Sequence, residues 1–92
     1  MIMYVKNVSG SSRFSSPPGY SSWLEYWKSK TGQNPYYCST RGCYGTDLVG
    51  GHVQKANSSD NRWYIVPLCR ACNTRTDIFF VEAELVPVPS NL

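Results

Sequence analysis

Four cysteines in two close pairs constrain this sequence more than any other feature. Four residues separate Cys38 from Cys43, two separate Cys69 from Cys72, and 25 residues lie between the two pairs. The chain has 92 residues, and a chain of this length forms one small domain that buries only about 60% of its unfolded surface. So small a core needs a cross-link, and the cysteines are the side chains that can supply one.

The cysteine spacing favours a structural zinc site. A two-residue gap lets the thiolates of Cys69 and Cys72 point at one tetrahedral ion, and the 25-residue gap allows a hairpin to bring Cys38 and Cys43 alongside. Four sulfur ligands leave no open coordination position, so such a zinc would stabilise the fold and perform no chemistry. Two disulfides are one alternative, and an iron site is another because thiolates also bind iron.

The N-terminal residues and the length of the apolar runs indicate where the chain is located. The first residues contain no apolar segment followed by a small-residue cleavage site, so we expect no secretory signal and a reducing, cytoplasmic environment. No apolar run approaches the roughly 20 residues that a membrane helix needs, so we expect no membrane partner.

Charge is unevenly distributed along the chain. Residues 1–75 contain all nine lysines and arginines and three acidic residues, whereas residues 76–92 contain three acidic residues and no basic one. Four thiolates on one zinc ion take the formal charge from +3 to about +1, so net charge alone does not indicate a nucleic-acid partner. Five basic residues near the cysteine segments are candidate phosphate ligands, with ordinary solvated charge as the alternative: Arg41, Lys55, Arg62, Arg70 and Arg75.

A helix over residues 23–31 is the clearest element that the sequence predicts. Ser22 and Glu25 form a capping box at its start, and a glycine follows its last residue. Its two tryptophans are four residues apart and share one face, so we expect them to anchor the helix on the core rather than to stack on bases.

The remaining elements are expected to be short strands and turns. The Ser- and Pro-rich connector at 9–19 is expected to be the most mobile segment. The expected elements are a strand at 4–8, a strand through 48–53, a polar connection at 55–61, a strand at 63–68 whose pairing ends at Pro67, a short helix from 69 to about 76, and a final strand at 78–88.

Part of the chain resembles the ββα-metal motif of HNH-type endonucleases, which have a treble-clef zinc fold. The carrying segments are Gly50-Gly51-His52-Val53 and Ile-Val-Pro-Leu-Cys-Arg-Ala-Cys-Asn at 65–73. In that family one strand ends in Asp-His, a hairpin carries an Asn, and a second strand leads through Leu-Cys-x-x-Cys into a helix that starts with His or Asn. The resemblance covers residues 36–80 and implies that the four cysteines hold a structural zinc.

The resemblance also implies positions for a catalytic site. His52 matches the general base, Asn73 matches a ligand of a second divalent cation such as magnesium, and Asn61 matches the residue that orients the histidine. Gly51 stands where the family has its acidic metal ligand, and Asn61 lies farther from the second cysteine pair than is common. Local alternatives are a backbone-bonded or zinc-binding role for His52, a helix cap at Asn73, and a bulge at the two glycines.

The sequence therefore predicts an α+β fold, a small zinc-stabilised treble-clef or HNH-like ββα module with an N-terminal helix and a C-terminal strand. Residues 1–92 form one domain, with a strand, connector and helix in 1–35, the HNH-like zinc module in 36–80, and the last strand and tail in 81–92. Its expected function is non-catalytic binding of nucleic acid or a protein. The alternatives are a small metal-dependent nuclease with His52 as base, and an inhibitory or structural protein-interaction module. Thirteen aromatic residues exceed what so small a core must hold, so we expect some of the tyrosines at 20, 36, 37 and 44 to be exposed.

Overall fold

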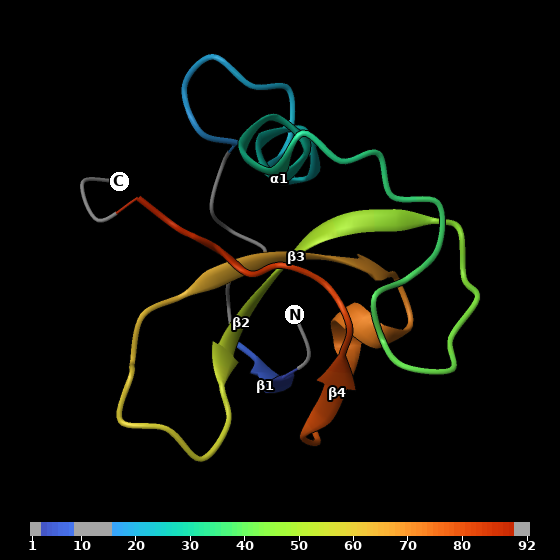
Figure 1. The fold of residues 1–92 in the computed structure, drawn as a ribbon, viewed down its shortest axis with the longest axis vertical. Coiled ribbons are helices and arrows are strands. Elements are labelled where there is room, and N and C mark those ends of the chain that lie inside the picture. The colour runs from blue at the N-terminus through green and yellow to red at the C-terminus, as the bar shows by residue number, and fades with distance from the viewer. Residues whose placement is uncertain (1–2, 9–15, 90–92) are drawn as a thin grey trace.

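One helix and a five-stranded antiparallel sheet make up the fold (Figure 1). The computed structural model describes residues 3–8 and 16–89 of the 92. The strands lie in the order β4-β1-β2-β3-β5, so the first strand of the chain is an inner strand of the sheet. The elements are β1 (Met3–Asn7), α1 (Trp23–Thr31), β2 (Leu48–Lys55), β3 (Tyr64–Cys69), the short 3₁₀ helix η2 (Cys72–Thr74), β4 (Phe79–Val81) and β5 (Val86–Pro87).

The helix α1 begins and ends as its capping residues predict. The Ser22 hydroxyl accepts a hydrogen bond from the Glu25 N–H at 3.1 Å. At the other end Gly32 adopts φ 69°, and its N–H donates to the Lys28 carbonyl at 2.8 Å. A Cβ atom at Gly50 of β2 would lie 2.6 Å from the backbone of Trp23, so this glycine lets the start of α1 approach the sheet.

The strands β2 and β3 separate two apolar clusters. Alternate residues point to opposite faces of a strand, so His52 and its partner Ile65 face α1, whereas Val53 and Val66 face β1 and β4. Figure 1 shows α1 on one side of β2 and β3 and the strands β1 and β4 on the other. Strand β3 is buried along its whole length because both of its faces are covered.

The loop at residues 38–43 connects two strands that are not neighbours in the sheet. The Ser39 N–H donates to the Pro67 carbonyl of β3 at 3.0 Å, and the Ser39 carbonyl accepts from the Glu82 N–H at 2.8 Å. The Arg41 N–H donates to the Phe80 carbonyl of β4 at 2.8 Å. Residues 39–41 therefore close the gap between β3 and β4 and enclose the apolar cluster beneath them.

Two strand predictions are wrong in detail. Pairing between β2 and β3 continues beyond Pro67 to the pair Leu48–Cys69. Pro67 stands opposite Gly50 and its carbonyl points away from β2, toward Ser39, so the sheet does not need the N–H that proline lacks. The expected final strand at 78–88 is two strands, because the chain crosses from β1, which pairs with β4, to β3, which pairs with β5.

The other elements lie close to their predicted positions. Strand β1 is shifted by one residue, and the helix expected from residue 69 is confined to the single turn η2. Most of the connector expected to be mobile, residues 9–15, lies outside the described residues. In the ranges that the structure describes, no helix has the length and apolar character needed to cross a bilayer.

Replacing Trp27 tests how much α1 contributes to stability. Trp27 is 1% exposed, and its Nε1–H donates to the Glu84 carbonyl at 2.7 Å. Trp27→Ala is expected to lower the free energy of unfolding by about 3–5 kcal/mol, because it empties a core site. Urea denaturation followed by circular dichroism measures the change. Tyr36→Ala, at a side chain that is 74% exposed, is the control and should stay within about 0.5 kcal/mol of the parent; an equal loss in both variants would contradict the prediction.

Candidate metal centre

The four cysteine sulfurs converge at one end of the sheet. All four Sγ atoms lie within 4.8 Å of one another, and none forms a disulfide. The Sγ of Cys43 lies 3.7 Å from that of Cys69 and 3.9 Å from that of Cys72. In a tetrahedral site with Zn–S bonds of about 2.3 Å, sulfur atoms stand about 3.8 Å apart. The cluster therefore has the donor set and the spacing that one metal ion requires.

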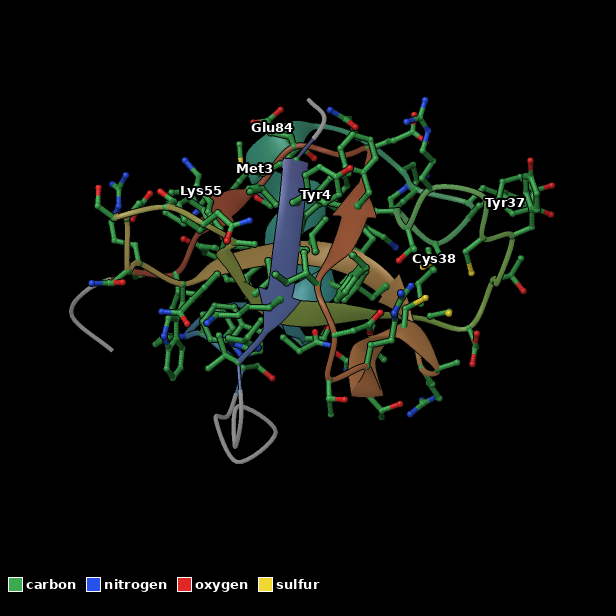
Figure 2. The ribbon with its side chains drawn as sticks, turned by 90° about the horizontal axis from the view of Figure 1, so that it is seen from below. Met3, Tyr4, Tyr37, Cys38, Lys55 and Glu84 are labelled. Atoms are coloured by element: carbon green, nitrogen blue, oxygen red, sulfur yellow. The ribbon has the colours of Figure 1, made fainter. Side chains whose placement is uncertain are left out.

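Two segments far apart in the sequence position these sulfurs. Cys69 is the last residue of β3 and Cys72 the first of η2, and the Cys72 N–H points at the Cys69 Sγ at 3.5 Å. Figure 2 shows Cys38 beside this end of the sheet, on the loop that follows α1. The Cys38 N–H donates to the Gly45 carbonyl at 2.8 Å, and the Cys43 N–H donates to the Thr40 carbonyl at 2.9 Å. The structure explains why four residues separate Cys38 from Cys43. These residues form backbone hydrogen bonds with β3 and β4.

Burial and hydrogen bonding give the thiols unequal acidity. Burial raises the pKa of Cys69 to about 12 and also raises the pKa of Cys72. Burial acts in the same direction on Cys38, but hydrogen bonds from the Thr40 hydroxyl and from backbone N–H groups outweigh it and lower the pKa to about 7. The Thr40 Oγ1 lies 3.4 Å from the Cys38 Sγ. Four thiolates in so small a volume need a cation, and metal binding would therefore release protons.

Two supporting residues of this site were not singled out from the sequence. Asn7, at the end of β1, donates from Nδ2 to the carbonyls of Cys72 and Arg75, each at 2.9 Å, and so holds η2 against the sheet. Thr40 is buried beside Cys38. A polar residue ending a strand and a threonine between two cysteines are common patterns, so only the topology reveals these roles.

His52 lies on the helix side of the sheet, away from the sulfurs. It is 5% exposed, and its ring meets those of Trp23 and Trp63 edge-on, with centroids at 4.9 and 6.2 Å. Burial lowers the pKa of His52 to about 4. The side chain is therefore neutral at pH 7, and it takes no part in the cysteine cluster.

The structure does not bring His52 and Asn73 together. A Cβ atom at Gly51 would lie 2.9 Å from the Asn73 Oδ1, so Asn73 lies on the face of β2 to which position 51 points. The next residue, His52, points to the opposite face. Asn61 is exposed in the connection between β2 and β3, where its carbonyl accepts from the Gln54 amide at 3.0 Å. Asn73 lies inside η2, and no side chain caps the start of that helix.

Acidic partners occupy most of the five candidate phosphate ligands. Asp60 binds both Lys55, at 3.4 Å, and Arg62, at 3.1 Å, while Asp77 binds Arg75 at 2.6 Å. The Arg41 Nε lies 3.9 Å from Glu82, the longest of these contacts. Arg70, between Cys69 and Cys72, is exposed and forms no ion pair with any residue that the structure describes. Of these five candidates, the two that remain available are therefore those within the metal-binding segments, Arg41 and Arg70.

Comparison of the chain with protein-family models, with curated proteins and with solved structures found no match. The chemistry of the site therefore carries the functional argument.

Removing one sulfur tests whether the cluster is a metal site. The reduced protein is expected to bind one metal ion per chain, and Cys69→Ser is expected to lose it and to be largely unfolded, because metal binding and folding are coupled. Elemental analysis and circular dichroism measure the two effects. Arg70→Ser, an exposed change in the same turn, should keep both the metal and the fold. A metal-free parent that is fully folded would contradict the prediction.

The buried histidine predicts how stability depends on pH. The pKa of His52 is about 4 in the folded chain and about 6.5 in an unfolded one. The contribution of the neutral His52 side chain to the free energy of unfolding is complete above pH 6.5. It is lost as the pH falls from 6.5 toward 4, by at most about 1.4 kcal/mol per pH unit. Urea midpoints of the parent and of His52→Gln, measured from pH 7.5 to 5, isolate this effect, since acid release of metal acts on both. The stability difference between the two should change over this range; a constant difference would refute the assignment.

Proposed function

We propose that this chain is a zinc-stabilised, non-catalytic nucleic-acid-binding module of HNH-like treble-clef type, acting in the cytoplasm. The observation that carries the proposal is the cluster of four sulfurs, with two contacts at 3.7 and 3.9 Å, in a chain with little core. Zinc is the metal that suits four thiolates in tetrahedral geometry. Sulfur then fills every coordination position, so the ion joins loop 38–43 to β3 and η2 and contacts no substrate.

The arrangement of β2 supports a binding role rather than a catalytic one. An HNH-type reaction needs a histidine base and a metal-binding acid or amide that act on the same phosphate. In this chain Gly51 supplies no carboxylate, and His52 and Asn73 lie on opposite faces of the sheet. A histidine buried between two tryptophans is also shielded from a phosphodiester.

Two arginines support nucleic acid as the partner. Arg41 lies between the first two cysteines and Arg70 between the last two, and both are exposed. The metal would hold both segments rigidly, so the backbone from which each arginine extends would be fixed. Guanidinium groups bind phosphate oxygens through two parallel hydrogen bonds.

A cluster of tyrosines favours a protein partner as the second candidate. Tyr36, Tyr37 and Tyr44 are 74%, 52% and 76% exposed, and their rings touch edge-on with centroids at 5.0 and 5.8 Å. Rigid tyrosines of this kind are enriched at the centres of protein interfaces.

Salt-dependent binding tests the first candidate. The zinc-loaded chain is expected to bind fluorescein-labelled DNA or RNA, with an affinity that falls as salt rises, because phosphate contacts release counterions. Arg70→Ala should weaken binding and reduce the salt slope by about one. Arg62→Ala is the matched control and should change little, because Asp60 already binds that side chain. Fluorescence anisotropy at several salt concentrations measures both.

Two outcomes would contradict this proposal. Cleavage of the nucleic acid in magnesium or manganese that disappears in His52→Ala would make the chain a nuclease. Failure to bind any nucleic acid at low salt, together with a protein partner whose binding is lost in Tyr37→Ala, would favour the second candidate.

A further inference from the structure

The outer face of β1 and β4 carries an aromatic pair, of which Tyr4 is exposed and Phe80 is half-buried. Tyr4 and Phe80 are directly opposite each other in the antiparallel ladder, and their ring centroids are 4.6 Å apart. Tyr4 is 57% exposed, whereas the residues on either side of Phe80 point inward and are buried. The helix packs on β2, β3 and β5 and leaves this part of the sheet uncovered. Figure 2 shows β1 and β4 side by side in front of β2 and β3, with Tyr4 on β1.

Two cations flank this aromatic pair. The Arg41 guanidinium lies over the Phe80 ring, 5.1 Å from its centroid. Lys6 is two residues after Tyr4 on the same exposed face of β1, and it makes no ion pair within the ranges that the structure describes. Glu82 is the acidic group nearest to Arg41, at 3.9 Å, and the Arg41 side chain stays 65% exposed. We call Tyr4, Lys6, Arg41 and Phe80 the β1–β4 surface.

The metal-binding loop fixes one side of the β1–β4 surface. Arg41 belongs to the loop between Cys38 and Cys43, and its N–H donates to the Phe80 carbonyl at 2.8 Å. The neighbouring Thr40 forms a bridge with Val81 of β4. The cation is therefore positioned over the ring by the backbone and by the cysteines on either side of it, and not by the flexible arginine side chain alone.

We propose that the β1–β4 surface binds single-stranded nucleic acid. An unpaired base stacks on Tyr4, beside Phe80, and the adjoining phosphates contact Lys6 and Arg41. Aromatic rings that alternate with cations along an open strand surface are the elements that sequence-tolerant single-strand binding uses. A base inside a duplex has no free face for such stacking, so the surface selects unpaired strands. This inference rests on the proposed nucleic-acid-binding function and adds to it the site and the form of the nucleic acid.

The charge on this surface favours nucleic acid over a protein. Two exposed cations stand beside the aromatic pair, against one carboxylate at 3.9 Å. At the tyrosine cluster, by contrast, the segment 31–40, which contains Tyr36 and Tyr37, has no charged residue. The β1–β4 surface therefore suits a nucleic acid, whereas the tyrosine cluster suits a protein.

Binding of a short oligonucleotide tests the proposal directly. The probes are a fluorescein-labelled 12-residue oligothymidylate and a labelled DNA duplex of the same length, each titrated with the zinc-loaded full chain. Tyr4→Ala is expected to raise the Kd for the single strand about tenfold, the loss typical of one stacked base, whereas Tyr4→Trp should retain binding. Lys6→Gln should reduce the salt slope by about one. Tyr36→Ala is the control, because it removes another exposed tyrosine, 74% exposed against 57% for Tyr4, away from this surface.

The outcomes separate this inference from the proposed function. Undiminished binding of the oligonucleotide by folded Tyr4→Ala, or an equal loss in Tyr36→Ala, overturns the β1–β4 surface and leaves nucleic-acid binding standing. Tighter binding of the duplex than of the single strand overturns the choice of unpaired strands. No binding of either probe at low salt overturns both proposals and directs the search to a protein partner. Circular dichroism of every variant shows that the fold is retained.

Discussion

The convergence of four sulfurs at the end of β3 is the constraint on which the rest of the fold depends. Residues 39–41 close the space between β3 and β4 through backbone hydrogen bonds, and the cysteines on either side of them bring two sulfurs to those of Cys69 and Cys72. Without an ion, burial keeps the thiols of Cys69 and Cys72 protonated at neutral pH, since it raises the pKa of both. A bound divalent cation would remove that cost and would tie loop 38–43 to β3 and η2.

The alternation of side chains along β2 separates two residues that the resemblance to HNH-type sequences assigns to one catalytic centre, His52 and Asn73. Position 51 points toward Asn73 and position 52 toward α1. The absence of a Cβ at Gly51 also serves packing, because a Cβ there would lie 2.6 Å from the Leu68 side chain. The same strand uses Gly50 for the approach of α1. Packing therefore explains why both positions are glycine, without a role in binding phosphate.

Local signals in the sequence predicted the local structure well. The capping box of α1, the burial of its two tryptophans and the grouping of the cysteines follow from patterns within a few residues, and the structure has all three. Features that depend on distant partners were missed. Pro67 indicates the end of a strand when its sequence alone is considered, because only the structure shows that its carbonyl faces Ser39. The alternation at 78–88 indicates one strand, because the sequence does not show that the chain switches from pairing with β1 to pairing with β3. The ion pairs of Arg62 with Asp60 and of Arg75 with Asp77 are a different case, because each spans only two residues and was therefore open to prediction from the sequence.

The inner position of β1 has a consequence for how the chain folds. β1 is the first strand to be synthesised, yet its neighbours are β2 and β4, and Asn7 bonds a carbonyl 65 positions away. The edge of β1 that pairs with β4 stays exposed until residues 79–81 have been synthesised. Long-range pairing of this kind is slow to form. The charge on Lys6, the one charged residue of β1, then has a second use, because like charges discourage two nascent β1 segments from pairing with each other before β4 arrives.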